Sequence, residues 1–286
     1  MQKTSLKLAV IGDPVAHSLS PSIHRAALMA AGLEGSYEAI KVEPEDLRAE
    51  VGRLREAGYA GFNVTIPHKT AILPLLDMVD AVSRSTGAVN TVRVTAVGLE
   101  GFNTDVGGIR SVLDARVGEQ GWANRVAIVL GTGGAARAAV TALQQNGSEV
   151  VVAARSRQRA RDALPHVNRI LALAEVSRLQ TELDRAMLLI NATSVGMGRP
   201  EESPLPDGCL LPPRLLVCDL VYSPRCTRLL RTAEAAGCRT ADGIEFLIAQ
   251  AAQSFVLWTG VEPDLAAMRR ACQEPAPSGA TAIGAG

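Results

Sequence analysis

The feature that most constrains the fold is a regular alternation of short apolar runs with helical segments along most of the chain. Most of these runs are continuous rather than interrupted by polar residues, which is typical of parallel strands covered by helices on both faces. Repeated β-α-β alternation predicts an α/β fold with open, mainly parallel sheets and right-handed crossovers. The predicted strands are Lys7–Ile11, Tyr37–Val42, Gly61–Thr65, Val126–Leu130, Glu149–Ala154, Met187–Asn191 and Leu215–Leu220.

Helix boundaries are indicated by residues that favour helix ends. Ser20 is expected to be the N-cap of a helix with Pro21 at its first position, and Gly32 ends that helix. The segment PEDLRAEVGRLREAG follows Glu43 and is expected to be a second helix that closes at Gly58.

One break in the alternation divides the chain. The segment AVNTVRVTAVGLEGFNTD predicts two short strands joined by a glycine-containing turn, and a helix follows from about Asp105. A new βαβ unit begins after the segment VGEQGWAN. We therefore place a first domain at residues 1–105 and a second at 106–242, and we expect the Ala-, Gly-, Pro- and Ser-rich residues 274–286 to form a disordered tail.

Composition and charge exclude several classes of protein. Of 286 residues, 47% are hydrophobic and 20% are charged, the net charge is zero, and the isoelectric point is near 6.9. We therefore expect no nucleic-acid or membrane partner. The five cysteines show no C-x-x-C spacing and the four histidines no ligand pattern, so we predict no metal. Scattered thiols and an N-terminus without a signal-like apolar core favour a cytoplasmic location.

A glycine fingerprint lies in RVAIVLGTGGAARAAVTAL, where Gly131, Gly133 and Ala136 have G-x-G-x-x-A spacing. It follows a buried-strand pattern and opens an Ala-rich helix, which is the context of a dinucleotide site; the alternative is an ordinary glycine-rich turn. Gly131 allows the tight turn, Gly133 lets the backbone approach a pyrophosphate, and Ala136 keeps the helix close to the strand. Gly134 and Ala135 begin the helix whose N-terminus favours the anion. The second domain is therefore predicted to be a Rossmann domain.

The end of the next strand selects the cofactor. An NAD site places Asp or Glu there, but VVVAARSRQRA has Arg155 and Ser156, followed by Arg157 and Arg159. Guanidinium groups can hold a 2′-phosphate with paired hydrogen bonds, whereas a carboxylate would repel it. The alternative is a solvated basic first turn, which would oppose the helix dipole. We predict NADP as the cofactor, with Arg155, Ser156 and Arg159 among its ligands.

Polar clusters in the first domain indicate a site for a small polyhydroxylated molecule. Two of the clusters follow the carboxyl ends of predicted strands, where ligands of open α/β sheets bind. Hydroxyls, amides and one ion pair do not suit an apolar ligand. The residues are Ser18 and Ser20; Asn63, Thr65 and Lys69; and Asn90, Asn103, Thr104 and Asp105.

Taken together, these segments resemble the shikimate dehydrogenase family. The motifs, from Ile11 to about Gly260, are SLSPSIH, NVTIPHK, GAVNTV, GFNTDVGG, GTGGAAR, NATSVGM, DLVYSPRCT and DGIEFLIAQA. The resemblance implies reversible reduction of 3-dehydroshikimate to shikimate with NADPH, a step toward the aromatic amino acids. It also implies that the first domain binds the substrate and that residues 243–273 return to it.

The resemblance assigns roles to individual residues. Ser18 and Ser20 match the serine pair that binds the substrate carboxylate. Lys69 and Asp105 match the catalytic pair. Further matches to the substrate site are Thr65, Asn90, Tyr222 and Gln250; packing is the alternative for Tyr222, and an outward orientation is the alternative for Gln250. The resemblance also adds four residues to the predicted cofactor site: Asn191, Thr193 and Met197, beside the nicotinamide, and Gly243.

The chemistry of Lys69 follows from its charge. As an ammonium it can donate a proton during reduction, and as an amine it can accept one during oxidation. A nearby Asp105 favours the charged form, which suits reduction at neutral pH and predicts faster oxidation at alkaline pH. The neighbouring His68 is expected to project elsewhere.

Three departures from the family pattern bear on affinity or substrate shape rather than on catalytic groups: Ala154, Arg25 and Phe246. Two other functions stay open on the sequence. One is a quinate or quinate/shikimate dehydrogenase, and the other is a non-catalytic NADP-binding sensor on the same fold. The sequence also leaves monomer and homodimer open.

Overall fold

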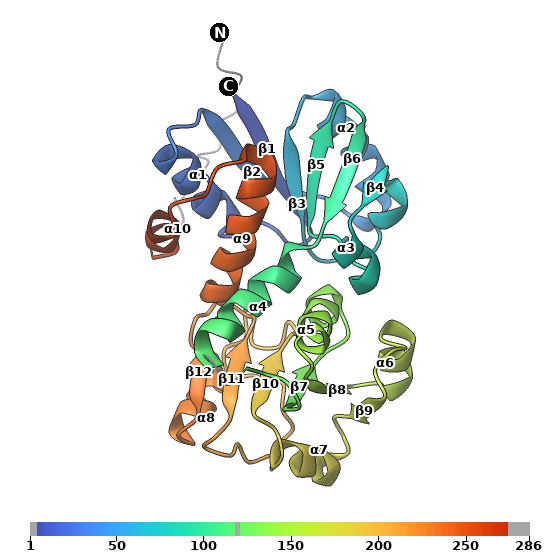
Figure 1. Ribbon diagram of the computed structural model, residues 1–286, viewed down its shortest axis with the longest axis vertical. Helices are drawn as coiled ribbons and strands as arrows, with labels where there is room; N and C mark the ends of the chain where they lie inside the picture. The colour runs from blue at the N-terminus through green and yellow to red at the C-terminus, as the bar shows by residue number, and fades with distance from the viewer. Residues whose placement is uncertain (1–4, 118–120, 274–286) are drawn as a thin grey trace, which may run out of the picture.

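The structure is a computed structural model that describes residues 5–117 and 121–273. It contains two six-stranded sheets, one in each half of the molecule, with helices packed on their faces (Figure 1). The α/β prediction with an open first sheet and a Rossmann unit is confirmed. The predicted tail, residues 274–286, lies outside the described part of the chain.

The first sheet is mixed and has the strand order β2-β1-β3-β5-β6-β4. Its pairs β1–β2, β1–β3 and β4–β6 are parallel, whereas β3–β5 and β5–β6 are antiparallel, and β5 and β6 form the predicted hairpin. The elements of this part are β1 (Leu6–Gly12), α1 (Ser20–Ala30), β2 (Gly35–Lys41), the 3-10 turn η1 (Pro44–Asp46), α2 (Leu47–Glu56), β3 (Gly61–Val64), η2 (Leu73–Leu75), β4 (Met78–Val79), α3 (Ala81–Thr86), β5 (Thr91–Thr95) and β6 (Gly98–Phe102).

The second sheet is parallel throughout, with the order β12-β11-β10-β7-β8-β9. The chain starts in the middle at β7, runs outward to β9, and then returns to β10 on the other side of β7. This is the Rossmann order, and its direction reverses between β7 and β10. The elements are α4 (Thr104–Val117), β7 (Val126–Leu130), α5 (Gly134–Gln145), β8 (Glu149–Ala154), α6 (Arg157–Ala163), β9 (Arg169–Ala172), α7 (Val176–Leu183), β10 (Leu188–Asn191), β11 (Leu216–Asp219), α8 (Arg228–Ala235) and β12 (Arg239–Ala241).

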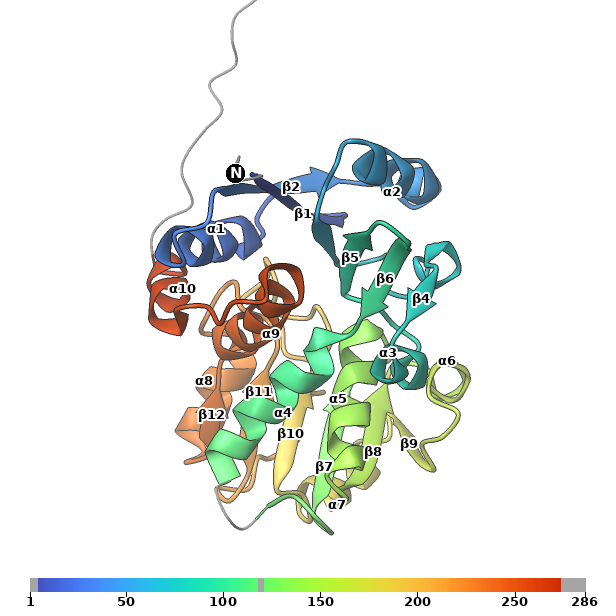
Figure 2. The same cartoon turned by 45° about the horizontal axis from the view of Figure 1, so that its top comes forward.

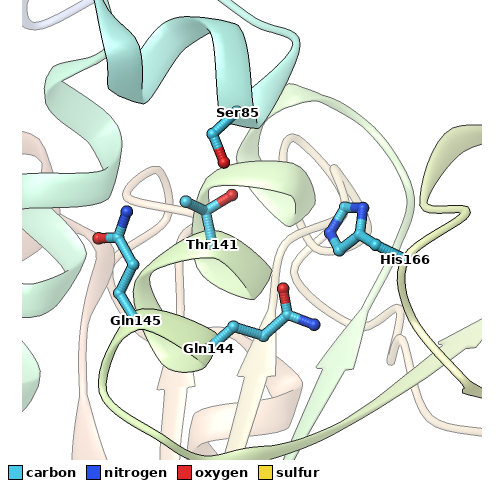
Figure 3. A pocket seen from close by; sticks show the side chains of 5 residues that line it. All are labelled: Ser85, Thr141, Gln144, Gln145 and His166. Carbon is cyan, nitrogen blue, oxygen red and sulfur yellow. The ribbon is translucent and has the colours of Figure 1, made fainter.

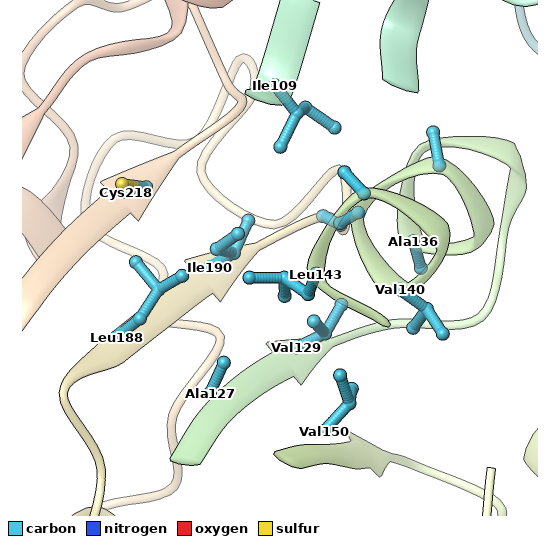
Figure 4. Close-up of a cluster of buried hydrophobic side chains, with 14 of the residues drawn as sticks. Ile109, Ala127, Val129, Ala136, Val140, Leu143, Val150, Leu188, Ile190 and Cys218 are labelled. Carbon is cyan, nitrogen blue, oxygen red and sulfur yellow. The ribbon is translucent and has the colours of Figure 1, made fainter. Parts of the chain in front are cut away.

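Each sheet has an apolar core on both faces. In the second sheet, one core lies under α4 and α5 and the other under α7 and α8. Figure 4 shows the first of these, where Val140 and Leu143 of α5 and Ile109 of α4 meet Val129 and Ile190 of the central strands. In the first sheet, α2 covers one face, while α1, α9 (Gly243–Thr259) and α10 (Leu265–Ala271) supply the core of the other.

The last two helices follow the second sheet in sequence but pack against the first sheet's helix α1. Helix α9 also packs along α4 between the two halves (Figure 2). Asp242 caps α9 by accepting hydrogen bonds from the backbone N–H groups of Ile244 and Glu245, at 3.1 and 3.4 Å. A methyl group added at Gly107 or Gly108 of α4 would lie 2.2 Å from a Gln253 side-chain atom or 2.9 Å from the Gln250 nitrogen. Glycine is therefore what allows these helices to approach closely.

The predicted strands agree with the structure to within two residues, but the predicted cap of α1 was wrong. Leu19, not Ser20, is the N-cap residue, and it makes no side-chain cap hydrogen bond. The Ser18 hydroxyl instead accepts a hydrogen bond from the Ser20 backbone N–H at 3.2 Å. Three short strands (β4, β9 and β12) were not predicted. Within the described ranges, no helix is both long and apolar enough to cross a bilayer.

Candidate active site

An ion pair lies where the two halves of the molecule meet. The chain turns after β3, and the His68 N–H donates to the Thr65 carbonyl at 2.9 Å, which places Lys69 beside the first turn of α4. The Lys69 Nζ and Asp105 Oδ2 atoms are 2.5 Å apart. The two side chains are 17% and 14% exposed, so both are shielded from bulk water but still accessible to a small molecule. The structure thus brings together two residues separated by 36 positions.

His68 points away from this pair. Its side chain is buried, and Nε2 lies 2.7 Å from the carbonyl oxygen of Val42, just after β2. The ring therefore joins the turn after β3 to the end of β2, as a structural contact. The expectation that His68 projects away from Lys69 is confirmed.

The Asn90 side chain connects Asp105 to the rest of the first half. Its Nδ2 donates to Asp105 Oδ1 at 2.8 Å and to Gln250 Oε1 at 3.2 Å. Its Oδ1 accepts the backbone N–H of Thr104 at 2.8 Å. The structure therefore places Gln250, from α9, beside the ion pair rather than in an outward orientation.

The predicted carboxylate-binding residues lie after β1. Ser18 is half-buried and Ser20 is buried at the start of α1. Tyr222 reaches the same region, because its phenol lies close to the Ser18 side chain. Burial raises the pKa of Tyr222, and the nearby Ser18 side chain offsets only part of this, so the phenol stays protonated near neutral pH. Thr65 is half-buried beside Gly12, where an added methyl would lie 2.3 Å from Thr65 Cγ2.

The glycine fingerprint forms a cradle between β7 and β10. Gly131 has φ of 114°, and a methyl there would lie 3.0 Å from Thr193 Cγ2 and 3.1 Å from the Ala192 carbonyl oxygen. Only glycine suits both the conformation and the space. Gly133 is the N-cap of α5 and supplies no side-chain cap, which leaves the first N–H groups of the helix available to an anion. These features fit the pyrophosphate of a dinucleotide.

The catalytic candidate rests on this cradle. A methyl group added at Gly134 would lie 3.0 Å from Cδ and 3.3 Å from Cβ of Lys69. The aliphatic part of Lys69, which belongs to the first half, therefore packs against the first residue of α5, which belongs to the second. Lys69, the acid–base candidate, therefore lies directly against the end of α5 that is available to an anion.

The arginines after β8 differ in their partners. Arg157 donates to the Ile170 carbonyl at 3.1 Å and pairs with Glu175 at 3.0 Å. Within the described residues, the exposed side chains of Arg155 and Arg159 have no carboxylate partner. Ser156 caps α6 by accepting the Arg159 N–H. Two unpaired guanidinium groups beside a helix N-terminus fit the 2′-phosphate of NADP.

The loop after β10 is held by a buried carboxylate. Asp219 Oδ1 accepts a hydrogen bond from Asn191 Nδ2 at 2.9 Å, and Asp219 Oδ2 accepts one from Thr227 at 2.7 Å. Asn191 Oδ1 accepts both the N–H and the hydroxyl of Thr193, at 3.0 and 2.7 Å. The Asn191 side chain is thus committed to the loop, whereas Thr193 is half-buried and Met197 is 43% exposed.

Gly243 begins α9 directly under the loop that carries Tyr222. A methyl group there would lie 2.5 Å from the Val221 carbonyl atoms and 2.7 Å from the Tyr222 nitrogen. The glycine therefore allows the backbone of this loop to lie against the helix.

A cavity of about 290 Å³ lies between α3 and α5, on a different part of the molecule. Ser85, Thr141, Gln144, Gln145 and His166 line it (Figure 3). None of these is a predicted site residue or contacts the ion pair. Within the described ranges, no group of three or more His, Cys, Asp or Glu side chains could hold a metal ion.

The sequence analysis missed several residues that support the site. Tyr37, Thr91 and Ser254 form buried hydrogen bonds with Asn63, at 2.6, 3.1 and 3.1 Å. Ser254 lies four residues after Gln250 on α9, and this helical spacing could have placed it on the same face. No spacing or motif in the sequence indicated that Tyr37 would contact Asn63. Of the departures from the family pattern, Arg25 donates to the Tyr37 carbonyl at 2.9 Å, and Phe246 is buried in a core.

The Rossmann order, the glycine cradle and the Lys69–Asp105 ion pair beside that cradle define a dinucleotide-dependent oxidoreductase. The family models described as "Shikimate dehydrogenase substrate binding domain" and "Shikimate 5'-dehydrogenase C-terminal domain" match residues 10–92 and 243–273. A relative from Synechocystis sp., named shikimate dehydrogenase (NADP(+)), is 40% identical over 94% of this chain and 95% of its own length. The chain belongs to the shikimate dehydrogenase family.

Two solved structures are also similar. One is shikimate 5-dehydrogenase from Thermus thermophilus in complex with NADP(H) and shikimate. It is 42% identical, with a TM-score of 0.83 over 94% of this chain and 98% of that one. The other is quinate dehydrogenase from Corynebacterium glutamicum in complex with NAD. It is 32% identical, with a TM-score of 0.83 over 93% of this chain and 98% of that one.

Proposed function

We propose that this chain is an NADP-dependent shikimate dehydrogenase that reversibly reduces 3-dehydroshikimate to shikimate in aromatic amino acid biosynthesis. The observation that carries the proposal is the Lys69–Asp105 ion pair, whose lysine packs against Gly134 at the anion-binding end of α5. A proton donor that lies in contact with a dinucleotide cradle suits the reduction of a carbonyl group. Family membership supplies the substrate class.

Lys69 is the proposed proton donor. When bound, NADPH supplies the hydride that reduces the carbonyl carbon. The Lys69 ammonium donates a proton to the carbonyl oxygen as the alcohol forms, and the amine takes a proton from the hydroxyl in the reverse direction. Asp105 orients the ammonium through the 2.5 Å contact between Lys69 Nζ and Asp105 Oδ2.

The remaining predicted residues are proposed as binding groups. Ser18, Ser20 and Tyr222 would hold the substrate carboxylate, because the Ser18 hydroxyl lies near both the Tyr222 phenol and the Ser20 backbone N–H after β1. Thr65, Asn90 and Gln250 would contact ring hydroxyls beside the ion pair.

The cofactor would lie across the second sheet. Its pyrophosphate would meet Gly131, Gly133, Gly134 and Ala135, and its 2′-phosphate would meet Arg155, Ser156 and Arg159. Its nicotinamide would meet Thr193, Met197 and the Gly243 region, with Asn191 acting by shaping the loop.

The domain limits are proposed as residues 1–105 with 243–273 for the substrate unit and 106–242 for the cofactor unit. Packing of α9 and α10 on α1 supports this division. We also propose a cytoplasmic enzyme that works as a monomer or homodimer, which light scattering of the purified chain would decide.

One assay tests the function. The purified protein is mixed with NADP⁺ and shikimate, quinate or no acid, and NADPH absorbance is followed; NAD⁺ is then substituted. Shikimate with NADP⁺ should give the highest kcat/KM. A higher value with quinate would make the enzyme a quinate dehydrogenase. Protein that binds NADP⁺ and turns over neither acid would be a sensor and would overturn the proposal.

A further inference from the structure

A buried network of polar side chains lies behind the ion pair, on the side away from the second sheet. Thr91 and Ser254 are fully buried, and Asn63 is 6% exposed. They come from β5, α9 and β3, and Thr91 lies directly opposite Asn63 in the antiparallel pair of strands. Burying so many polar atoms is costly unless each has a partner.

The donors and acceptors of this network can be assigned. Asn63 Nδ2 lies 3.1 Å from the hydroxyls of both Thr91 and Ser254, and it can only donate. The Thr91 and Ser254 hydroxyls lie 2.8 Å apart, so one of their two protons lies between them. With Ser254 as the donor, the Thr91 proton is free to donate to Asn90 Oδ1 at 3.1 Å. The Ser254 oxygen lies 3.1 Å from the Gln250 carbonyl oxygen one turn earlier, which keeps this hydroxyl in place on α9.

The orientation of the Asn90 amide determines how the Asp105 carboxylate faces Lys69. Its oxygen is held by the Thr91 hydroxyl and by the Thr104 N–H, which can only donate. Its amide nitrogen must then face Asp105 Oδ1, at 2.8 Å. With one carboxylate oxygen held by Asn90, the other is left for Lys69. A flipped Asn90 amide would instead direct its oxygen at the carboxylate.

We propose that Thr91 and Ser254, supported by Asn63, are positioning residues that fix the Asn90 amide and thereby hold Asp105 against Lys69. None of the three contacts Lys69 or Asp105 directly. The proposal rests on the proposed function, because it assigns these residues a part in the Lys69 proton transfer. Among the described residues, no charged side chain other than these two partners forms an ion pair or hydrogen bond with either.

Thr91→Val tests the proposal, because valine keeps the shape of threonine and removes the hydroxyl. We expect kcat for shikimate oxidation to fall about tenfold, the scale of one lost hydrogen bond. KM for NADP⁺ should stay within about twofold, since the cofactor cradle is untouched.

Three further variants separate positioning from general loss of structure. Thr91→Ser retains the hydroxyl and should restore kcat. Ser254→Ala should lower kcat as Thr91→Val does. Thr86→Val is the matched control, since the Thr86 hydroxyl is also buried but, among the described residues, bonds the Val82 carbonyl at 2.7 Å and not Asn90. It should leave kcat within about twofold of the wild-type value.

The outcomes distinguish the two proposals. If the wild-type protein does not reduce NADP⁺ with shikimate, the proposed function fails. If the wild type is active and Thr91→Val retains its kcat, the positioning role is wrong. A Thr91→Val defect that Thr91→Ser does not restore, or that Thr86→Val reproduces, would also overturn it.

Discussion

At the scale of single residues, the site depends on which polar groups have partners and which do not. Lys69 has a carboxylate partner beside the cofactor cradle, whereas its neighbour His68 is bonded to the backbone after β2. Arg157 pairs with Glu175, whereas Arg155, two positions earlier, has no carboxylate partner among the residues that the structure describes. Neighbouring residues of similar chemistry therefore have different consequences when changed.

Replacing Lys69 should remove the proton donor. Lys69→Ala is expected to lower kcat about 100-fold or more in both directions, since general acid–base catalysis contributes about 10²–10⁴-fold. The measurement is the NADPH absorbance assay at saturating substrate. His68→Gln is the control and should reduce thermal stability more than kcat, because His68 is buried against Val42. Near-normal turnover by Lys69→Ala would reject the assignment.

Removing the unpaired arginines should weaken NADP specifically. The double variant Arg155→Gln, Arg159→Gln is expected to raise KM for NADP⁺ about 10- to 100-fold, because charge-assisted hydrogen bonds to a phosphate contribute about 1.5–3 kcal/mol. KM for NAD⁺, which lacks the 2′-phosphate, should change little. Arg157→Gln is the matched control, because its guanidinium is engaged by Glu175. Equal losses for both cofactors would contradict this role.

The sequence predicted the members of the ion pair but not the residues behind them. Lys69 and Asp105 lie in recognisable motifs, Lys69 in the turn after β3 and Asp105 in the first turn of α4. Thr91 and Ser254 are 163 positions apart and meet only because α9 returns to the first sheet. A single serine in an apolar helix has no local signal for such a contact, since its partners are set by tertiary packing.

At the scale of helices and strands, glycine decides how closely elements approach. Gly243 lies under the backbone of Val221 and Tyr222, and Gly52 of α2 faces open space. The two positions have the same residue type in a helix but opposite surroundings. They form a matched pair for substitution by alanine.

Gly243→Ala should destabilise the protein by about 1–3 kcal/mol, because its methyl group would overlap the backbone at 2.5 Å and force a shift. The shift would move Tyr222, so KM for shikimate should rise as well. Gly52→Ala should instead stabilise the protein by about 0.5–1 kcal/mol, since alanine favours the helix and meets no neighbour. Urea unfolding measures both. Equal changes at the two sites would show that the close contact is not limiting.

The strands that were predicted with their observed limits and those that were missed differ in burial, position and length. Val126–Leu130 and Glu149–Ala154 were predicted with their observed limits, because they are central and continuously apolar. Strands β4, β9 and β12 are two to four residues long and lie at sheet edges. Short edge strands have one paired side and mixed polarity, so pattern alone does not reveal them.

At the scale of the whole molecule, a buried histidine links stability to pH. His24 is fully buried and stacks on Tyr37 with ring centroids 4.4 Å apart, and neither ring nitrogen has a hydrogen-bond partner in the part of the chain that the structure describes. Burial lowers the pKa of His24 from 6.5 to about 3. The nearby Asn63 opposes this shift, but its own polar atoms are committed to other partners. The ring is therefore neutral in the folded protein.

Acid should destabilise the fold through this residue. An unfolded chain protonates His24 near pH 6.5, whereas the folded chain does so only near pH 3. The stability is fully present above the higher value and is lost as pH falls, by roughly 1.4 kcal/mol per pH unit across this window. His24→Leu, which cannot titrate, should show a shallower loss between pH 6.5 and 4.5 in urea unfolding. Parallel pH profiles for the two proteins would contradict the prediction.

The contact between Lys69 and Gly134 lies between the residues proposed for proton transfer and those proposed for cofactor binding. Every hydrogen bond that holds Lys69, Asp105 and Asn90 together comes from residues 1–105 or from α9, whereas Gly134 contributes only a flat surface. The arrangement of Lys69, Asp105 and Asn90 therefore does not depend on hydrogen bonds from the second half. A chimera that joins this substrate half to the nucleotide half of a relative should keep the proposed proton donor in place. The nucleotide half would need only a glycine at the position of Gly134.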